Sequence, residues 1–429
     1  MTTPAYSSRR NTERRSISNV GLGTTGLSHT VGHIDDTRAA VVIELGRVTT
    51  KCGYAGDYTP RRICRTEYFD ENGIVRQDVL DGYENAKRPN DAALQRFFKL
   101  LYFTHLLVEP RERRVVLVEN ILYPTEFRHA LCRVLMDKMD VPSVLFLPSH
   151  LCATFPFNTE NALVLELGFK ESLVIPVALG VSLLNSHEIS SIAEKRLQER
   201  LAELLLAHGT ITGHHDDSRR ISEEDMMKIR ERNLLEDICT RLLFCSSRER
   251  GLLIQEKAHE AELNNPKPRD ANVNLDGETL VIPGFIREAA CEVFFVNDSP
   301  DEPALPHLIF NAIMKVPIDL RRQMFSSLLV TGGPALRLGF LGRLKEELLA
   351  LGVEMKQKAA STIKFHRFQN EPGTELYLNW LGGAMFGSIR DALACRSVSR
   401  ELWQEKHRIP DWTDFVQYNV RSGRTDMQG

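Results

Sequence analysis

Residues 40–57, "AVVIELGRVTTKCGYAGD", contain the pattern that decides the fold. An apolar run ends in the carboxylate Glu44, a tight turn follows at Gly46, and a second short strand comes next. Glycine lets the backbone approach a ligand closely, and a tight turn can point backbone N–H groups at a phosphate. A carboxylate at the strand end can orient a hydrated Mg²⁺. The stretch therefore predicts a β-hairpin that carries either a phosphate clamp or the remains of one.

The same pattern occurs a second time, in "LVLELGFKESLVIPVALG" at 163–180. Here an apolar strand is followed by Glu166, a leucine and Gly168, and then by a polar turn and another strand. A third signal, "VTGG" at 330–333, lies where a strand is predicted to give way to a helix. Two such hairpins that face each other can hold a polyphosphate between two lobes. The pattern leaves one alternative open, which is a pair of ordinary buried hairpins with glycine in their turns.

Composition places the chain among ordinary globular proteins. It has 429 residues, which suits two domains or one large bilobed fold. Hydrophobic residues make up 42% and charged residues 26%, and the net charge of −3 gives no basic excess for binding nucleic acid or a membrane surface. The eight cysteines form no CxxC pair, which is typical of a reduced cytosolic protein. The longest weakly polar run, 172–184, is too short to span a membrane.

Strands and helices are predicted to alternate, which favours an α/β fold. Strands are predicted at 40–44, 113–119, 141–147, 162–166, 172–177 and 326–330. Thr125 is predicted to cap a helix, and a second helix is predicted after Gly333. The stretch "WLGGAMFGSIRDAL" at 380–393 repeats the order of Gly-Gly and then helix.

Two regions depart from this alternation. Residues 1–37 are rich in Ser, Thr, Gly and Arg and are predicted to be a disordered arm. The region at about 190–285 is charged and predicted to be mostly helical, with a loop at 208–220 and a turn-rich connector at 264–274. The sequence "HHDD" at 214–217 could bind a metal, but a polar loop of this kind is more often simply solvated.

At this point the sequence resembles the actin family over most of residues 38–415. The resemblance rests on "IELGRVTTKCGYAGDYTPR", "RVVLVENILYPTEFRHALCRVLM", "VPSVLFLPSHL", "LVLELGFKESLVIPVALG", "LLVTGGPALRLGFLGRL" and "LNWLGGAMFGS". It implies an α/β fold of the actin, Hsp70 and sugar-kinase class, with two lobes, four subdomains and a central nucleotide cleft. The implied first lobe is 38–168 with 372–429, including a shortened second subdomain at about 66–96. The implied second lobe is 169–371, with the helical subdomain at about 190–285 inserted in it.

The resemblance implies a set of vestigial nucleotide-binding residues. These are Glu44, Gly46, Lys51, Glu166, Gly168, Gly332 and Gly333. The phosphate side departs from the family pattern, because small residues of the first turn are replaced by Arg47 and Val48, and an Asp and a Gly of the second turn by Phe169 and Lys170. The family's water-orienting Gln aligns with Ser149. Val48 should obstruct a phosphate, and Phe169 cannot orient metal-bound water.

The adenosine side departs further. The residues that align with a Gly-Arg-Asp near the ribose are Glu194, Lys195 and Arg196. Those that align with a Lys-Glu pair near the base, a Tyr after the Gly-Gly loop and a cleft lysine are Cys239, Thr240, Arg337 and Leu376. We therefore expect no catalytic residue, no metal ligand and no ATP hydrolysis, and no required cofactor. Bound ATP or ADP as a structural ligand is left open.

Within the family, "RERRVVLVEN", "VPSVLFLPSHL" and the tail "RSVSRELWQEKHRIPDW" resemble the actin-related subunit at the pointed end of dynactin. That resemblance implies a cytoplasmic, cytoskeletal protein beside actin or centractin at a filament end, with dynactin subunits 4, 5 and 6 and, indirectly, dynein. It implies neither nucleic-acid binding nor membrane insertion. The polar region between Arg65 and Phe97 is too short for the loop with which actins grip the next subunit, which is expected of a cap.

Two other functions are compatible with the fold. A self-polymerising actin-like ATPase needs a competent cleft and the gripping loop. A small-molecule kinase needs an Asp general base and a substrate pocket, and no candidate for that base is evident in the sequence.

Overall fold

The structure is a computed structural model that describes residues 38–69, 75–77, 90–213, 217–256, 268–297, 302–368 and 371–409. The predicted arm at 1–37 and most of the "HHDD" sequence lie outside these residues, as does most of the segment between the strands near Arg65 and the helix at Phe97. No helix within the described ranges is long and apolar enough to cross a membrane.

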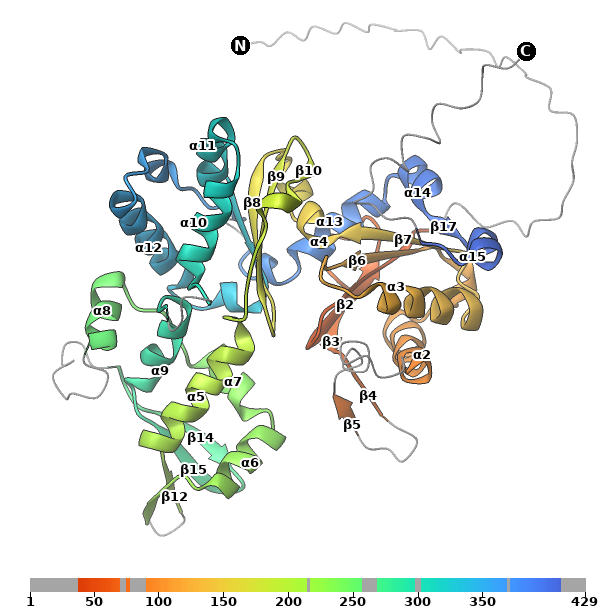
Figure 1. Cartoon of the computed structure of the whole chain (residues 1–429). Coiled ribbons are helices and arrows are strands. Elements are labelled where there is room, and N and C mark those ends of the chain that lie inside the picture. Colours follow the sequence, from red (N-terminus) through yellow and green to blue (C-terminus); the bar gives the residue numbers. More distant parts are fainter. Residues whose placement is uncertain are drawn as a thin grey trace, which may run out of the picture. The chain divides into compact units, whose positions relative to one another are not determined.

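A six-stranded mixed sheet forms the first core, with the strand order β17-β7-β6-β1-β2-β3. Strands β1, β6 and β7 are parallel neighbours, and β2 runs back along β1 as its hairpin partner. Figure 1 shows this sheet in orange and gold, with β17 in blue at its edge. The strands are Val41–Leu45 (β1), Thr49–Tyr54 (β2), Arg62–Arg65 (β3), Val115–Glu119 (β6), Ser143–Pro148 (β7) and Val398–Ser399 (β17).

Both faces of this sheet are covered by helices, which explains why its central strands are continuous apolar runs. Along β1, Val41 and Ile43 pack with helices α2, Asp91–Leu100, and α3, Thr125–Cys132. Val42 points to the opposite face, where it packs with α13, Leu378–Gly387. The predicted strands and the amphipathic helix after them are therefore confirmed.

The second core is a sheet with the order β10-β9-β8-β16, and β11 pairs with β9. Strand β8 is antiparallel to β9 and parallel to β16, as β1 is to β2 and β6. Figure 1 shows α10, α11 and α12 on one side of this sheet. The elements are Ala162–Leu167 (β8), Ser172–Ala178 (β9), Val181–Ser182 (β10), Glu188–Ser190 (β11), Leu328–Thr331 (β16), Leu305–Lys315 (α10), Ile318–Ser326 (α11) and Phe340–Glu354 (α12).

The internal repeat predicted from the sequence is present in both cores. The turn between β1 and β2 is closed by a bond from the Gly46 amide to the Thr49 carbonyl at 3.1 Å. The turn between β8 and β9 is closed by the matching bond from Gly168 to Glu171 at 3.0 Å. Alanine at either glycine would bring its Cβ within 2.7 Å of the carbonyl oxygen that closes the turn. Both glycines are thus required by turn closure itself.

The region at about 190–285 is less helical than predicted. It contains the expected helices, but the predicted loop and connector form an antiparallel sheet with the order β13-β12-β15-β14. The loop between β14 and β15 is Asp276-Gly277, and both residues have positive φ, 56° and 92°, as a two-residue hairpin turn requires. The sequence reading missed this Asp-Gly signal because the two asparagines of β14, although they alternate regularly with its apolar residues, are depleted in strands and favour turns. The elements are Glu194–His208 (α5), Thr210–Thr212 (β12), Ser218–Arg220 (β13), Glu223–Glu231 (α6), Leu234–Arg241 (α7), Arg248–Glu256 (α8), Ala271–Leu275 (β14) and Glu278–Ile282 (β15).

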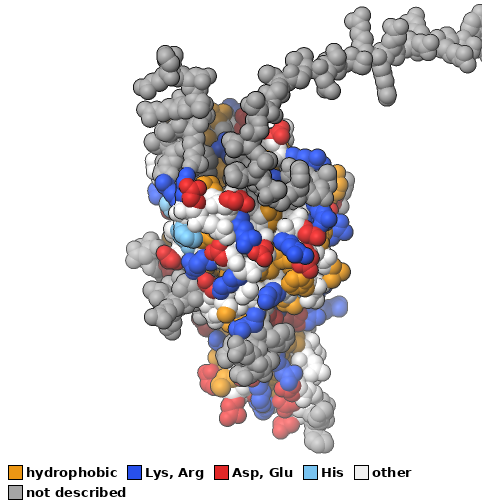
Figure 2. All heavy atoms as spheres, turned by 90° about the vertical axis from the view of Figure 1, so that its right-hand side faces the viewer, with side chains coloured by type: hydrophobic (Ala, Val, Ile, Leu, Met, Phe, Trp, Pro, Cys, Tyr) orange, Lys and Arg blue, Asp and Glu red, His pale blue; other side chains and the backbone are white. Residues whose placement is uncertain are grey.

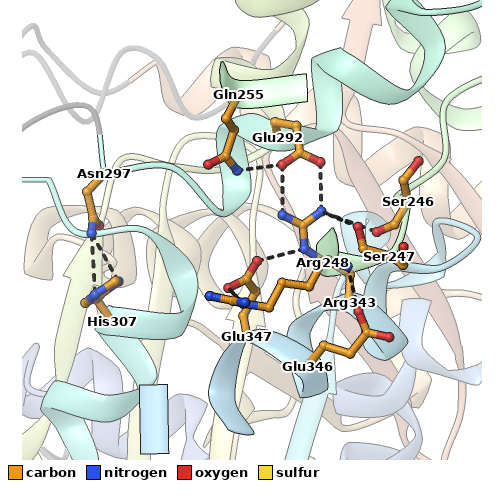
Figure 3. A network of polar contacts seen from close by, with 10 residues as sticks. All are labelled: Ser246, Ser247, Arg248, Gln255, Glu292, Asn297, His307, Arg343, Glu346 and Glu347. Atoms are coloured by element: carbon orange, nitrogen blue, oxygen red, sulfur yellow. Dashed lines mark hydrogen bonds and ion pairs between the residues drawn. The ribbon is translucent and has the colours of Figure 1, made fainter. Parts of the chain in front are cut away.

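A buried group of charges, the Arg343 cluster, consists of Arg343, Glu292 and Glu347 (Figure 3). The Arg343 side chain is fully buried. Its two terminal nitrogens donate to the two oxygens of Glu292 at 2.8 and 2.9 Å, and its Nε donates to Glu347 at 2.8 Å. The guanidinium also lies over the ring of Phe295, 4.5 Å from the centroid.

Helix α8 lies on the Arg343 cluster. The carboxylates of the cluster accept from Arg248 Nε at 3.0 Å and from Gln255 Nε2 at 2.7 Å. Between these contacts, Gly251 leaves room for the guanidinium, because a Cβ there would come within 2.0 Å of Arg343 Nη1. Helix α8 is thus joined to the rest of the chain by these polar contacts, by the ion pair of Arg250 with Glu288 and by Ile254, which is buried in the core.

Two predicted helix starts are wrong in detail. Thr125 is the first residue of α3 and not its cap, because the helix begins after Pro124, whose fixed φ of −59° suits a helix entry. Gly382 and Gly383 do not precede a helix but lie inside α13. A Cβ on Gly382 would come within 1.8 Å of the carbonyl oxygen of Cys152, so the pair serves close packing.

The remaining elements connect these parts. They are Glu67–Phe69 (β4), Val75–Gln77 (β5), Ser149–Cys152 (α4), Ile286–Ala289 (α9), Arg390–Arg396 (α14) and Arg400–Lys406 (α15). On the face seen in Figure 2, basic and acidic side chains are interspersed, with hydrophobic side chains between them. No charge of one sign gathers over the described part of that face.

Candidate functional site

A cavity of about 420 Å³ lies where the two hairpin turns meet the Gly-Gly loop after β16. All seven residues predicted from the sequence line it: Glu44, Gly46, Lys51, Glu166, Gly168, Gly332 and Gly333. Residues from both sheets thus converge on one site, as the repeated pattern predicted. That these residues bind a nucleotide stays a prediction.

At the first hairpin, Lys51 forms an ion pair with a carboxylate of its own chain. Glu44 and Lys51 are opposite each other in the register of β1 and β2, and Lys51 Nζ donates to Glu44 Oε1 at 2.8 Å. Their side chains are 13% and 8% exposed. Glu44 Oε2 is buried and has no hydrogen-bond partner in the structure. The lysine that the family would use for phosphate is therefore already neutralised.

At the second hairpin, Glu166 is held by two amides that the sequence reading missed. Asn120 follows β6 and Asn379 lies in α13, and each donates from Nδ2 to one oxygen of Glu166 at 3.1 Å. Asn120 directly follows a strand of the first sheet and Asn379 lies in a helix that packs on that sheet, whereas Glu166 belongs to the second sheet. Neither asparagine has a local signal, because only the folded chain brings residues 46 and 213 positions away to the same carboxylate.

Burial raises the pKa of the Glu166 carboxyl from its ordinary 4.5 to about 7; the Ser149 hydroxyl opposes this shift and the nearby Glu44 carboxylate adds to it. The folded state therefore binds this proton more tightly than the unfolded chain does. The stabilising contribution is complete below pH 4.5 and is lost as the pH rises through 7.

We expect Glu166→Gln to remove this pH dependence. Between pH 6 and pH 8 the wild-type chain should lose on the order of 1 kcal/mol of unfolding free energy through this one group, and the variant should not. The measurement is urea unfolding of both proteins at the two pH values. A difference between wild type and variant that stays constant with pH would contradict the assignment. Titration of groups that do not interact with Glu166 cancels in this difference.

Ser149 aligns with the family's water-orienting residue, and His150 is the next residue along the chain. Ser149 lines the cavity, but His150 is buried away from it and its Nε2 lies 2.7 Å from Ser182 Oγ. Burial lowers the pKa of His150 to about 3, so it is neutral at physiological pH. The structure thus gives His150 a packing role.

On the adenosine side, Glu194 and Arg337 form a buried ion pair. Arg337 Nη2 lies 2.7 and 2.6 Å from the two oxygens of Glu194, and their side chains are 4% and 14% exposed respectively. Burial alone would lower the pKa of Arg337, and the Glu194 carboxylate more than offsets this, so the pKa is raised. Thr240 and Leu376 also line the cavity, whereas Cys239 is buried and does not.

Lys195 and Arg196 form ion pairs away from the cavity. They pair with Glu199 and Glu203 along α5, at 3.7 and 3.2 Å, and neither lines the cavity. The alignment placed both near a ribose, and the structure does not bring them there.

The residues of this cavity do not fit a magnesium nucleotide well. Five carboxylates and four cationic side chains line it, so the site has no cationic excess for a polyphosphate. Gly332 has a φ of 110°, and a Cβ there would come within 2.0 Å of the Leu167 carbonyl oxygen, so packing accounts for it. Among the described residues, no group of three or more His, Cys, Asp or Glu side chains could hold a metal ion.

Comparison with known proteins places this geometry in context. The actin family model matches residues 35–409. The chain is 25% identical to Actin-related protein 10 of Dictyostelium discoideum, over 90% of this chain and 91% of that protein. It is 22% identical to Putative actin-29 of the same organism over 86% and 95%, and 23% identical to Actin-like protein of Neurospora crassa over 87% and 95%.

Proposed function

Because the chain belongs to the actin family, with the α/β fold predicted from its sequence, we propose that it is a non-catalytic structural subunit that caps the pointed end of the actin-like filament of dynactin. In that position it would support dynein-driven transport along microtubules. The observation that carries the proposal is the match to Actin-related protein 10 over nine-tenths of both chains.

The cavity supports a role without ATP turnover. The resemblance to the actin family implies a nucleotide between the two lobes. Here the chain's own side chains bridge these parts: two amides, on Asn120 and Asn379, donate to Glu166 of β8, and Arg65 of β3 pairs with Glu236 of α7 at 2.8 Å. Lys51 is paired, and Phe169 stands in the second turn. No nucleotide is required for these contacts.

The proposed partners follow from the same assignment. They are the end of a centractin or actin filament and dynactin subunits 4, 5 and 6, with dynein contacted indirectly, in the cytoplasm at the cytoskeleton. Termination of the filament is supported by the short, polar sequence between Arg65 and Phe97. A chain that joins a filament by one face and offers no gripping loop at the other would end its growth.

The other two functions have less support. A self-polymerising ATPase would need its phosphate lysine free and a metal support in the second turn. A kinase of this fold would need an Asp base, and none of the described residues that line the cavity is an Asp.

We expect gentle affinity purification of the tagged chain from its own cells to recover dynactin subunits, with this chain at one copy per complex by quantitative mass spectrometry. The chain purified free of its partners should hydrolyse ATP no faster than buffer, because the cleft lacks the groups that orient metal and water. Recovery of the chain alone, or in long polymers of itself with turnover, would overturn the proposal and favour the ATPase.

A further inference from the structure

The Glu194–Arg337 ion pair forms the wall at one end of the cavity. Two short contacts join Arg337 Nη2 to the carboxylate, and the guanidinium lies over the ring of Phe294 with its centre 5.8 Å from the centroid. Both side chains are largely buried. Either one would have to break the ion pair to reach solvent.

The backbone fixes this pair in place. Glu194 is the first residue of α5, where the helix N-terminus favours a carboxylate. The Glu194 amide donates to the Gly168 carbonyl at 3.3 Å, and the next amide of the helix donates to the Phe169 carbonyl at 2.7 Å. The start of α5 is thereby joined to the second hairpin turn, so the carboxylate cannot shift independently of the cavity wall.

We propose that the Glu194–Arg337 pair closes the adenosine end of the cavity and excludes adenine nucleosides. A purine and its ribose need space at this end, and the two paired side chains occupy it, with both Glu194 oxygens already accepting from Arg337 Nη2. To admit a nucleoside the chain would have to separate two buried, oppositely charged groups, which is strongly unfavourable. The inference goes beyond the proposed function, because a filament cap could hold a nucleotide or lack one.

The first test uses the wild-type chain. The full-length protein is purified without added nucleotide, denatured with acid, and the extract is analysed by chromatography. We expect less than about 0.1 mole of adenine nucleotide per mole of protein. A stoichiometric content of ATP or ADP would overturn the inference, whatever the purification of partners shows.

The second test removes the pair and then restores it. In Glu194→Ala/Arg337→Leu both charges are lost together, so that neither is left buried and unpaired. We expect this variant to bind ATP at least tenfold more tightly than the wild type by calorimetry, with no change for tripolyphosphate, which has no nucleoside. The reversed pair Glu194→Arg/Arg337→Glu should exclude ATP again. Equal ATP binding by wild type and the double alanine–leucine variant, with both folded, would show that the pair does not decide exclusion.

Discussion

Gly382→Ala is expected to destabilise the folded chain by about 3 kcal/mol, at the upper end of the usual cost of overpacking. The new Cβ would lie 1.8 Å from the carbonyl oxygen and 2.9 Å from the Cα of Cys152. Both are backbone atoms of α4, which cannot rotate away as a side chain can. The measurement is the midpoint of urea unfolding, followed by circular dichroism.

Gly342→Ala is the matched control, because it too adds one methyl group to a glycine within a helix. Gly342 lies in α12 and is exposed, and no atom lies within 4 Å of its hypothetical Cβ. Since alanine favours the helix over glycine by about 0.5–1 kcal/mol, this variant should be slightly stabilised. If the two variants shifted the midpoint in the same direction, close packing of α13 on α4 would not explain Gly382.

The same glycine shows where sequence reasoning reached its limit. The run "WLGGAMFG" predicts Gly-Gly followed by a helix, because Gly-Gly more often ends an element than occupies one. Only the approach of α4 to α13, more than 200 residues apart in the chain, gives the glycines their place. The hairpins were predictable because strand, turn and strand are adjacent in sequence. Even the Glu44–Lys51 pair follows from the hairpin register once the turn is known.

In the candidate site too, features that are local in sequence were predictable and contacts between distant residues were not. The seven residues predicted to converge, which are four glycines, two glutamates and one lysine, do line one cavity. They could be predicted because each belongs to a local sequence pattern. The sequence could not reveal which side chains pair with one another at this site. Asn120, Asn379 and the partner of Arg337 lie far along the chain from the groups that they contact, and such pairings carry no local signal.

Buried charge also explains why the second large effect is expected away from the cavity, at Arg343. Arg343→Met removes the partner of Glu292, whose side chain is 6% exposed, and leaves that carboxylate without its two short bonds from Arg343. Loss of one member of a buried pair costs about 3–5 kcal/mol, because the remaining charge is neither paired nor hydrated. Arg343→Lys should recover only part of this, since an ammonium cannot make the paired contacts of a guanidinium.

The effect of Arg343→Met should be greatest locally in α8, since that helix lies on the Arg343 cluster through polar contacts. Amide hydrogen exchange should therefore rise across 248–256 before the rest of the chain loosens, and the urea midpoint should fall with it. Arg241→Met is the control, because its ion pair with Asp237 is exposed, 63% and 38%, and such pairs contribute at most about 0.5 kcal/mol. If both variants lowered the midpoint equally, or α8 exchanged no faster in Arg343→Met, the cluster would not be what holds that helix in place.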